Sequence, residues 1–210
     1  WRTGNMSVEA PGKRARTGSD PVTVFDVKHG TVIHSSLNFQ NDGCDGDVVV
    51  SLSKDGGLHW DTVVEVADGG GPASCDGNGI FNDKEWITAD NNPASPFYGR
   101  AYVTWTAFKS VNGVTLESPI GEAHSDDGGF TWSTPKVISG SNSNLCTYQA
   151  DGPAGVCDED QFSVPSVGPD GTVYVSFNND QNTALWETGE FFDSQFLLVK
   201  SKDGGVTWSA

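Results

Sequence analysis

Ser125-Asp-Asp-Gly-Gly-Phe-Thr-Trp132 is one of three copies of an eight-residue phrase in this chain of 210 residues. The other two copies are Ser53-Lys-Asp-Gly-Gly-Leu-His-Trp60 and Ser201-Lys-Asp-Gly-Gly-Val-Thr-Trp208. A phrase that recurs at a nearly fixed period is the sequence signature of a repeat architecture. The sequence therefore predicts three structural units of one kind, each carrying one copy of the phrase.

Each copy has the chemistry of a tight turn between two strands. Glycine reaches positive φ at no steric cost, and a short Asp side chain accepts hydrogen bonds from the backbone of its own turn. The closing Trp is expected to enter the next strand and to bury its ring beneath the loop. We assign a structural role to the twelve residues Ser53, Asp55, Gly57, Trp60, Ser125, Asp127, Gly129, Trp132, Ser201, Asp203, Gly205 and Trp208.

The rest of each repeat predicts strands, because apolar and polar residues alternate and no helical stripe of normal length occurs. The first repeat is expected to hold strands at Val22–Val27, Thr31–Phe39, Asp47–Ser53 and Trp60–Ala67. The second repeat is expected to hold Glu85–Ala89, Ala101–Phe108, Ile120–Ser125 and Trp132–Ser139. The third is expected to hold Phe162–Val167, Thr172–Phe177, Phe196–Ser201 and a strand that starts at Trp208. Four antiparallel strands in a radially stacked unit form a β-propeller blade.

The fold class predicted is therefore an all-β propeller of four-stranded antiparallel blades. About three blades are expected, near residues 20–69, 83–140 and 160–210, the last of them incomplete, while residues 1–19 are a linker or N-terminal tail. Three blades cannot close a ring, so we expect the remaining blades of a longer parent chain as partners. The alternative is a small complete β protein that closes its ring by self-association.

The phrase resembles the Asp box, or BNR repeat, of the sialidase superfamily. The resemblance extends to Asn82–Asp90 with Gly99–Thr106 and to Val167–Val175, which look like the inner-strand pairs of exo-α-sialidase-like secreted bacterial proteins. It covers roughly residues 20–210. It implies a six-bladed propeller that acts on glycans or recognises them.

Sialidase chemistry in that family needs three arginines to grip a carboxylate, a Tyr activated by a Glu as nucleophile, and an Asp as acid/base. This chain has only Arg2, Arg14, Arg16 and Arg100. The first three lie in the expected tail, and Arg100 opens a second strand on the rim that carries the repeated turns. No arginine of the triad is found, so two hypotheses stand: a glycoside hydrolase of exo-α-sialidase type, or a non-catalytic binding module for glycans or proteins.

The long loops and the entrances of the first strands are expected on the opposite rim, where propellers usually bind. The innermost residues there are expected to be Asp20, Asp83–Glu85 and Asp158–Asp160. Residues 109–117 are counted among the loops. The aromatic residues Trp86 and Trp105 of the inner strands are expected between blades, in the core.

From this rim we select the candidate site residues. Asp83 and Glu85 are the candidate catalytic carboxylates, because two carboxyl groups straddle the bond in most glycosidases. Lys84, Trp186 and Asp160 are the candidate substrate contacts. The alternative is that Asp83 and Lys84 pair with each other at a strand entrance and serve only the fold.

The four cysteines also fall on the rim away from the turns, and their proximity favours the disulfides Cys44–Cys75 and Cys146–Cys157. Such bonds indicate a secreted or cell-surface protein. Four thiols that bind zinc are the alternative, although neither pair has the C-x₂-C spacing.

The overall charge limits the partners. A net charge of −16 and a pI near 4.3 exclude nucleic acid, and no apolar run is long enough to span a membrane. Carbohydrate or glycoprotein is the expected partner. We expect no cofactor and assign no metal site, with Ca²⁺ left open at Asp158-Glu159-Asp160.

Overall fold

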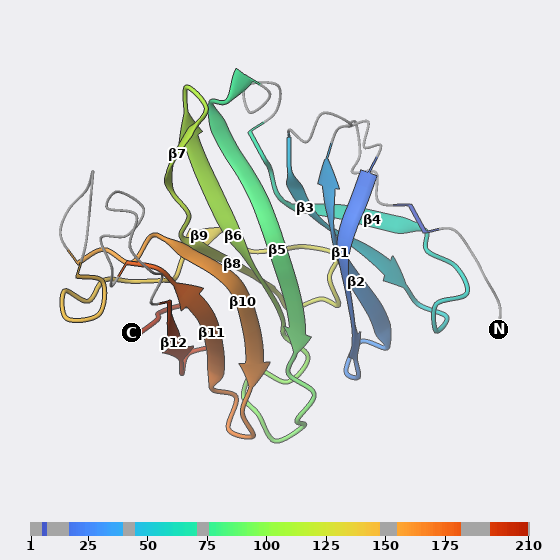
Figure 1. The fold of residues 1–210 in the computed structure, drawn as a ribbon. Helices are drawn as coiled ribbons and strands as arrows, with labels where there is room; N and C mark the ends of the chain where they lie inside the picture. The colour runs from blue at the N-terminus through green and yellow to red at the C-terminus, as the bar shows by residue number, and fades with distance from the viewer. Residues whose placement is uncertain are drawn as a thin grey trace.

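The computed structural model describes residues 6–7, 17–39, 45–70, 76–147, 155–181 and 194–209. Every long regular element in these ranges is a strand, and the strands form three antiparallel sheets side by side (Figure 1). Within the same ranges no helix is long and apolar enough to cross a membrane. The predicted all-β class and the predicted repeat of antiparallel sheets are confirmed.

Each sheet contains one copy of the repeat in meander order. The first consists of β1 (Thr17–Asp26), β2 (Thr31–Phe39), β3 (Asp47–Ser53) and β4 (Thr62–Ala67). The second consists of β5 (Gly79–Ala89), β6 (Ala101–Val111), β8 (Ile120–Ser125) and β9 (Lys136–Val137), with β7 (Val114–Glu117) paired to β6. The third consists of β10 (Asp160–Val167), β11 (Val173–Asn179) and β12 (Gln195–Ser201). We call these sheets blades 1, 2 and 3.

Four local predictions differ from the structure. The strand β5 begins at Gly79 and not at Glu85, so Asp83–Glu85 lie inside this strand and not at its entrance. The strand β1 begins at Thr17, three residues inside the predicted tail. The segment 109–117 is a hairpin and not a loop, because Asn112 and Gly113 both adopt positive φ and turn β6 directly into β7. The fourth strands of blades 1 and 2 begin at Thr62 and Lys136, so the Trp residues of the repeated phrase precede these strands instead of opening them.

The repeated turn is held by its Asp side chain. In blade 2 the Asp127 Oδ1 accepts the backbone N–H groups of Phe130 and Thr131 at 3.0 and 2.9 Å, and its Oδ2 accepts the Thr131 hydroxyl at 2.6 Å. The Trp132 indole donates to the carbonyl of Gly129 at 2.9 Å. The Ser125 hydroxyl accepts the N–H of Gly129 at 3.0 Å, so the Asp, the Ser and the Trp of the phrase together hold the turn.

The other copies repeat these bonds with one substitution. In blade 3 the Thr207 N–H and hydroxyl both donate to Asp203, at 2.8 and 2.5 Å. In blade 1 the place of Thr is taken by His59, whose Nδ1 lies 2.5 Å from Asp55 Oδ2. The imidazole of His59 and the hydroxyls of the two Thr residues contact the same oxygen, Oδ2, of their Asp. The three turns therefore keep the same geometry although one side chain differs.

The turns of blades 2 and 3 also pack on the preceding blade. A Cβ added to Gly129 would lie 2.8 Å from the Leu52 side chain of blade 1, and one added to Gly205 would lie 3.1 Å from His124 of blade 2. Both glycines have a φ of about 90°, which other residues rarely adopt. Glycine is therefore required at this position for two reasons: the backbone has positive φ, and the neighbouring blade leaves no space for a Cβ.

The hydrophobic core lies between neighbouring blades. One buried cluster joins Ile33, Leu37 and Val50 of blade 1 to Val103 and Trp105 of blade 2. A second joins Tyr102, Ile120 and Ile138 of blade 2 to Val173, Val175, Phe177 and Val199 of blade 3. Each face of blade 2 is therefore covered by a neighbour, as in a propeller.

Blade 3 has one face without such a cover among the described residues. Phe196 in β12 is equivalent to Val48 in blade 1 and to Ile120 in blade 2, because each stands on the third strand of its blade, five residues before the Ser of the repeated phrase. Those two side chains are fully buried, whereas Phe196 is 85% exposed. Its neighbours on this face, Leu198 and Val164, are also exposed. Blade 3 thus presents to solvent the apolar face that blades 1 and 2 bury.

Replacing Trp132 tests the role of the repeated turn in stability. We expect Trp132→Ala to lower the free energy of unfolding by about 3 kcal/mol, because it removes a ring packed against the core between blades 1 and 2. Trp132→Phe keeps most of the packing and loses the indole hydrogen bond, so about 1 kcal/mol is expected. Chemical denaturation followed by circular dichroism measures both, and equal losses for the two variants would contradict this account.

Candidate functional site

The first strands of the three blades share one irregularity. Each pairing register shifts by one bulge: between Ser19 and Val22 in β1, between Asp83 and Trp86 in β5, and between Gln161 and Val164 in β10. Each bulge contains two residues, and the first of them has positive φ: Asp20 at 52°, Lys84 at 53° and Phe162 at 59°. Such values are uncommon for residues other than glycine, and most of all for a bulky one.

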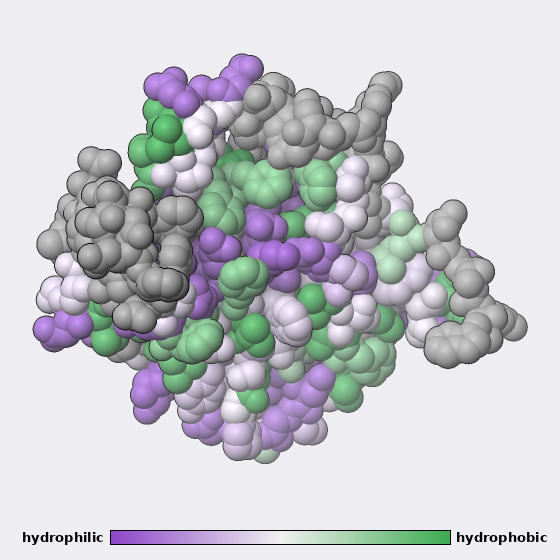
Figure 2. Space-filling model, viewed as in Figure 1, coloured by the Kyte–Doolittle hydropathy of each residue, from purple (hydrophilic) through white to green (hydrophobic). Residues whose placement is uncertain are grey.

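The three bulges enclose one pocket of about 290 Å³. Its lining consists of three consecutive residues from each strand, 20–22, 84–86 and 162–164. We call it the axial pocket, because it lies where the first strands of the three blades meet. Hydrophilic residues gather at the centre of this face, over β5, with hydrophobic residues around them (Figure 2).

Contacts across the axial pocket tie the three bulges together. The Lys84 ammonium lies 3.2 Å from Asp20 Oδ2 in blade 1 and 5.9 Å from the centre of the Phe162 ring in blade 3. The hydrogen bond with Asp20 raises the pKa of Lys84. Asp20, and not Asp83, is thus the ion partner of Lys84. Asp83 Oδ1 accepts the backbone N–H of Lys84 at 2.9 Å.

Glu85 is the most unusual group in the axial pocket. Its side chain is 1% exposed, and neither carboxyl oxygen has a hydrogen-bond partner. Burial raises the pKa of Glu85 to about 9, and the nearby charges of Asp20 and Asp83 act in the same direction. The carboxyl group is therefore protonated at neutral pH and presents an O–H donor.

Aromatic side chains stand at the axial pocket beside this acid. Trp86 is 44% exposed and Phe162 is 53% exposed, and both line the pocket. The prediction that Trp86 lies in the core is wrong, whereas the same prediction for Trp105 is confirmed. The reason is the bulge in β5, because the alternation that holds before Asp83 does not continue unchanged after it.

The remaining candidate residues lie elsewhere. Asp83 precedes the bulge and does not line the axial pocket, although burial raises its pKa. Asp160 is fully buried, and its Oδ1 accepts a hydrogen bond from Asn179 at 2.8 Å. Burial raises the pKa of Asp160 to about 7. Trp186 lies outside the described residues, so its predicted contact with substrate stays a prediction.

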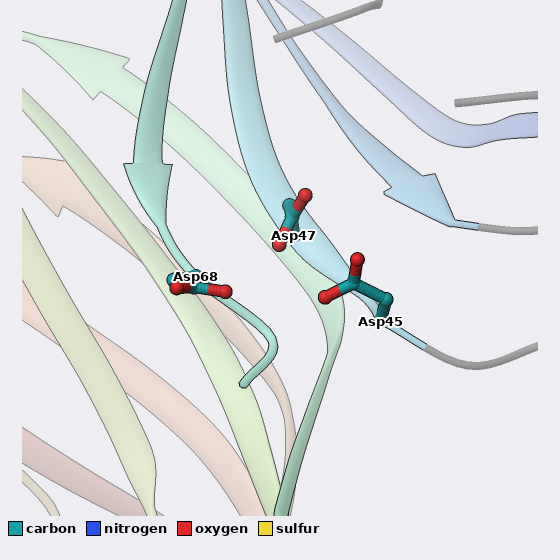
Figure 3. A group of neighbouring side chains, drawn as sticks. All are labelled: Asp45, Asp47 and Asp68. Atoms are coloured by element: carbon teal, nitrogen blue, oxygen red, sulfur yellow. The ribbon is translucent and has the colours of Figure 1, made fainter. Parts of the chain in front are cut away.

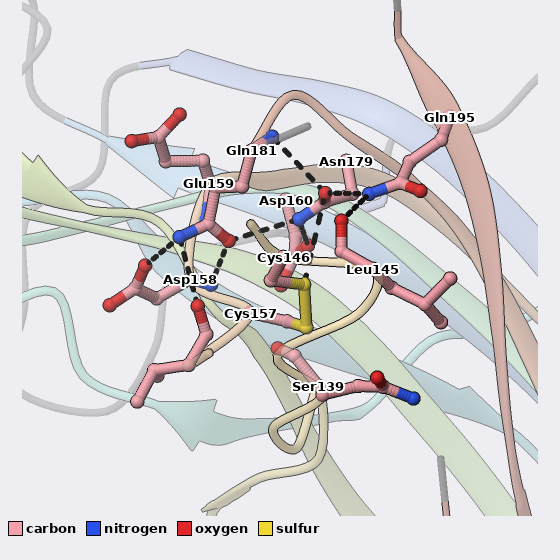
Figure 4. The surroundings of a disulfide bond; sticks show 12 residues. Ser139, Leu145, Cys146, Cys157, Asp158, Glu159, Asp160, Asn179, Gln181 and Gln195 are labelled. Atoms are coloured by element: carbon pink, nitrogen blue, oxygen red, sulfur yellow. Dashed lines mark hydrogen bonds between the residues drawn. A yellow bond between two sulfur atoms is a disulfide. The ribbon is translucent and has the colours of Figure 1, made fainter. Parts of the chain in front are cut away.

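The acidic run 158–160 is organised by amide side chains next to a disulfide (Figure 4). Gln181 accepts the N–H groups of Asp158 and Glu159 at 2.7 and 3.1 Å and donates to Asp158 Oδ1 at 2.7 Å. The disulfide itself joins Cys146 and Cys157, as predicted. The other predicted pair, Cys44–Cys75, lies outside the described residues.

A different acidic group has the arrangement of a metal site. One carboxylate oxygen each from Asp45, Asp47 and Asp68 lies within 4.8 Å of the others (Figure 3). Two of these carboxylates also serve the backbone, because Asp47 accepts the N–H of Gly69 at 2.8 Å and Asp68 that of Gly70 at 2.9 Å. The pairing of Val48 with Ala67 explains the convergence, since it brings the start of β3 beside the end of β4. Binding of Ca²⁺ at residues 158–160 stays a prediction.

The fold and the axial pocket can now be compared with known proteins. No family model matches the chain, and no curated protein matches it. The solved structures that match include the Hadza microbial sialidase Hz136, with a TM-score of 0.60, 19% identity, and coverage of 91% of this chain and 36% of that one.

Two further solved structures show the same likeness. A protein of unknown function from Dyadobacter fermentans DSM 18053 has a TM-score of 0.60 at 14% identity, with coverage of 97% of this chain and 56% of that one. The GH93 alpha-L-arabinofuranosidase of Fusarium graminearum has a TM-score of 0.53 at 15% identity, with 83% of this chain and 42% of that one covered.

These likenesses show a sialidase-like propeller fold. The identities are too low to carry an activity from those proteins to this one. The chain also spans only 36% to 56% of the length of the three structures.

The protonation of Glu85 can be tested without any ligand. Its pKa is about 9 in the folded state against an ordinary value of 4.5, so the folded state binds the proton more tightly between these values. The free energy of unfolding must therefore fall as pH rises from about 4.5 to about 9. Glu85→Gln cannot ionise and escapes this loss. We therefore compare the melting temperature of Glu85→Gln with that of the parent at each pH. The difference, variant minus parent, should grow by several degrees between about pH 5 and pH 8.

Thermal denaturation followed by circular dichroism at several pH values provides the measurement. Glu117→Gln is the matched control, because Glu117 lies outside the axial pocket and bonds Lys109 at 2.6 Å. Its difference from the parent should not rise with pH in this way. A constant difference between Glu85→Gln and the parent would show that Glu85 is ionised in the folded protein.

Proposed function

We propose that this chain is part of a glycan-directed propeller of Asp-box type and that its glycan site is the axial pocket. The observation that carries the proposal is the convergence of three bulged strands on one pocket that holds a buried acid, a lysine and two exposed aromatic rings. Aromatic faces with a few placed polar groups are the usual lining of a ligand pocket. The fold is also that of a sialidase and of an arabinofuranosidase, as those structures are described.

Recognition of a glycan is the activity that the geometry supports best. A carboxylate-gripping set of arginines is missing from the described lining, and so is a tyrosine. Arg100 is engaged on the other rim, where it forms two bonds to Asp126 and one to the carbonyl of Gly204. These residues do not supply the parts that sialidase chemistry needs.

Hydrolysis of a glycoside is the second candidate, and Glu85 favours it. A glycosidase needs one carboxyl group that still holds its proton at neutral pH and can give it to the leaving oxygen. Glu85 meets that condition, and Asp20 supplies a second carboxyl group in the same pocket, 3.2 Å from the Lys84 ammonium. Asp83 stays a candidate that acts from beside the pocket, and Asp160 stays a candidate contact from the loop at the disulfide.

The wider setting of the chain is also a proposal. The Cys146–Cys157 bond supports an oxidising compartment, and we propose secretion or display at the cell surface. We further propose that residues 20–210 form part of a larger propeller, with a further blade covering the apolar face of Phe196 and Leu198. The equivalence of Phe196 with the buried Val48 and Ile120 supports this proposal.

Glycan binding at the axial pocket can be tested at Trp86. We expect Trp86→Ala to weaken binding of a glycan ligand at least about tenfold, because it removes an exposed aromatic face of the pocket. The ligand is first found by screening the complete protein on a glycan array. Isothermal titration then measures the dissociation constant of parent and variant.

A matched control separates binding from folding. Phe130→Ala removes another exposed aromatic residue, on the repeated turn of blade 2, and should leave the dissociation constant unchanged. If both variants bind like the parent, the glycan site lies outside the axial pocket.

The proposed cover of blade 3 can be tested by chemical accessibility. In the complete protein we expect Phe196→Cys to resist a maleimide reagent, because a neighbouring blade buries this position. Val206→Cys is the control, since Val206 is 62% exposed on the repeated turn of blade 3, and it should react within minutes. Mass spectrometry of the labelled protein gives both rates. Equal rates would mean that the face stays open to solvent.

A further inference from the structure

We propose that the axial pocket selects an uncharged sugar and that the Glu85 carboxyl, in its neutral form, donates a hydrogen bond to that sugar. This inference rests on the proposed glycan-directed function and adds the class of ligand and the group that recognises it.

The position of Glu85 is the first support. The bulges place Pro21, Glu85 and Ser163 at equivalent positions of the three strands, and all three line the axial pocket. Only one of the three carries a carboxyl group. Proline and serine at the other two positions show that the bulge itself needs no acid there. The carboxyl group of Glu85 is therefore not required to build this corner of the fold.

The energetics of Glu85 point the same way. A buried polar group without a partner costs free energy, and an isolated buried charge costs more. Glu85 is fully enclosed, and no other described residue hydrogen-bonds to either carboxyl oxygen, so its burial brings a cost that its neighbours do not offset. Both oxygens are closed off from solvent, so the side chain has to turn into the axial pocket before a ligand can accept its O–H group and supply the missing partner. Asp20, the other carboxyl group of the described lining, lies 3.2 Å from the Lys84 ammonium.

The charges that face Glu85 decide what that ligand can be. From β1 it faces Asp20, and on its own strand it has Asp83 and Lys84 as neighbours. The lining that β10 contributes is Phe162, Ser163 and Val164, which brings no charge. The single cation of this set is held by Asp20 at 3.2 Å. A sugar carboxylate in the axial pocket would therefore meet Asp20 and a lysine that is already paired with it, and no unpaired cation among the described lining residues.

The remaining lining suits an uncharged ring. Trp86 and Phe162 offer aromatic faces to the C–H groups of a sugar, and the protonated Glu85 offers a donor to a sugar oxygen. A neutral carboxyl group can donate a hydrogen bond, whereas an ionised one can only accept. The pocket is thus matched to hydroxyl-rich, uncharged glycans, and this differs from the carboxylate-bearing sugar that the sequence resemblance implies.

The experiment compares matched glycans in the complete protein. The probes are neutral oligosaccharides and their acidic counterparts: lactose with 3′-sialyllactose, xylotriose with its glucuronic-acid-substituted form, and arabinobiose as a further neutral probe. We expect the neutral member of a pair to bind at least about tenfold more tightly than the acidic one near pH 7. Binding should weaken as pH rises through about 9, where Glu85 ionises.

Two variants connect the selectivity to Glu85. Glu85→Gln keeps an N–H donor of the same shape, so it should bind the neutral probe at neutral pH and lose the weakening near pH 9. Glu85→Leu has no donor and should bind at least about tenfold more weakly. Near pH 7 the infrared spectrum of the parent minus that of Glu85→Gln should show the carbonyl band of a protonated carboxyl group, because the band from Asp160 is common to both and cancels.

The possible results distinguish failure of the sugar selectivity from failure of the glycan-binding function. Tighter binding of the acidic member, or binding that Glu85→Leu leaves unchanged, would overturn the inference and leave the glycan site standing. Absence of binding by every probe and every array glycan would overturn the proposed function together with the inference. Absence of the protonated band would overturn the role of Glu85 whatever the ligand.

Discussion

The contact between a repeated turn and the blade before it is the constraint on which the rest of the structure depends. The turn can make that contact only because its Asp accepts the backbone N–H groups that would otherwise need water. With those groups satisfied, Gly129 and Gly205 can press their backbone against the neighbouring blade. The spacing between turns then fixes how each blade follows the last, and the core between blades forms from the faces that this arrangement brings together.

The two ends of the blades differ in how well their polar groups and backbone are satisfied. At the turn end, each Asp, Ser and Trp of the repeated phrase has its partner, and the bonds recur in three copies. At the axial pocket, three residues other than glycine adopt positive φ, and a buried carboxyl group has no partner. Such strained conformations cost of order 1–3 kcal/mol each and persist only where the surrounding fold imposes them. The well-satisfied turns are what allows the axial end to hold unfavourable groups.

The sequence predicted the parts of the fold that are local and repeated. The turns and the meander order depend on short-range patterns and are predicted correctly, whereas the strands that follow the turns begin later than predicted. The site was predicted less well. Lys84 and Glu85 were named as candidates, but Asp20 was named only as a neighbour of the axis and Trp86 was assigned to the core. The bulges explain this, because a one-residue shift in register leaves no mark in the alternation of apolar residues. Equivalent bulges in strands as different as β1, β5 and β10 become visible only when the registers are compared in space.

The Glu85 carboxyl group is protonated because the nearby cation, Lys84, pairs with a different residue. Lys84 occupies the bulge position of β5, and its side chain reaches Asp20 and Phe162 rather than Glu85. It thereby joins the three blades, and it cannot compensate a charge on the next residue. Had Lys84 turned to Glu85, the acid would be ionised and the pocket would contain an ion pair with no donor for a neutral ligand. The ion pair of Lys84 with Asp20 therefore has two effects. It links β5 to β1, and it leaves Glu85 without a counter-charge in the axial pocket.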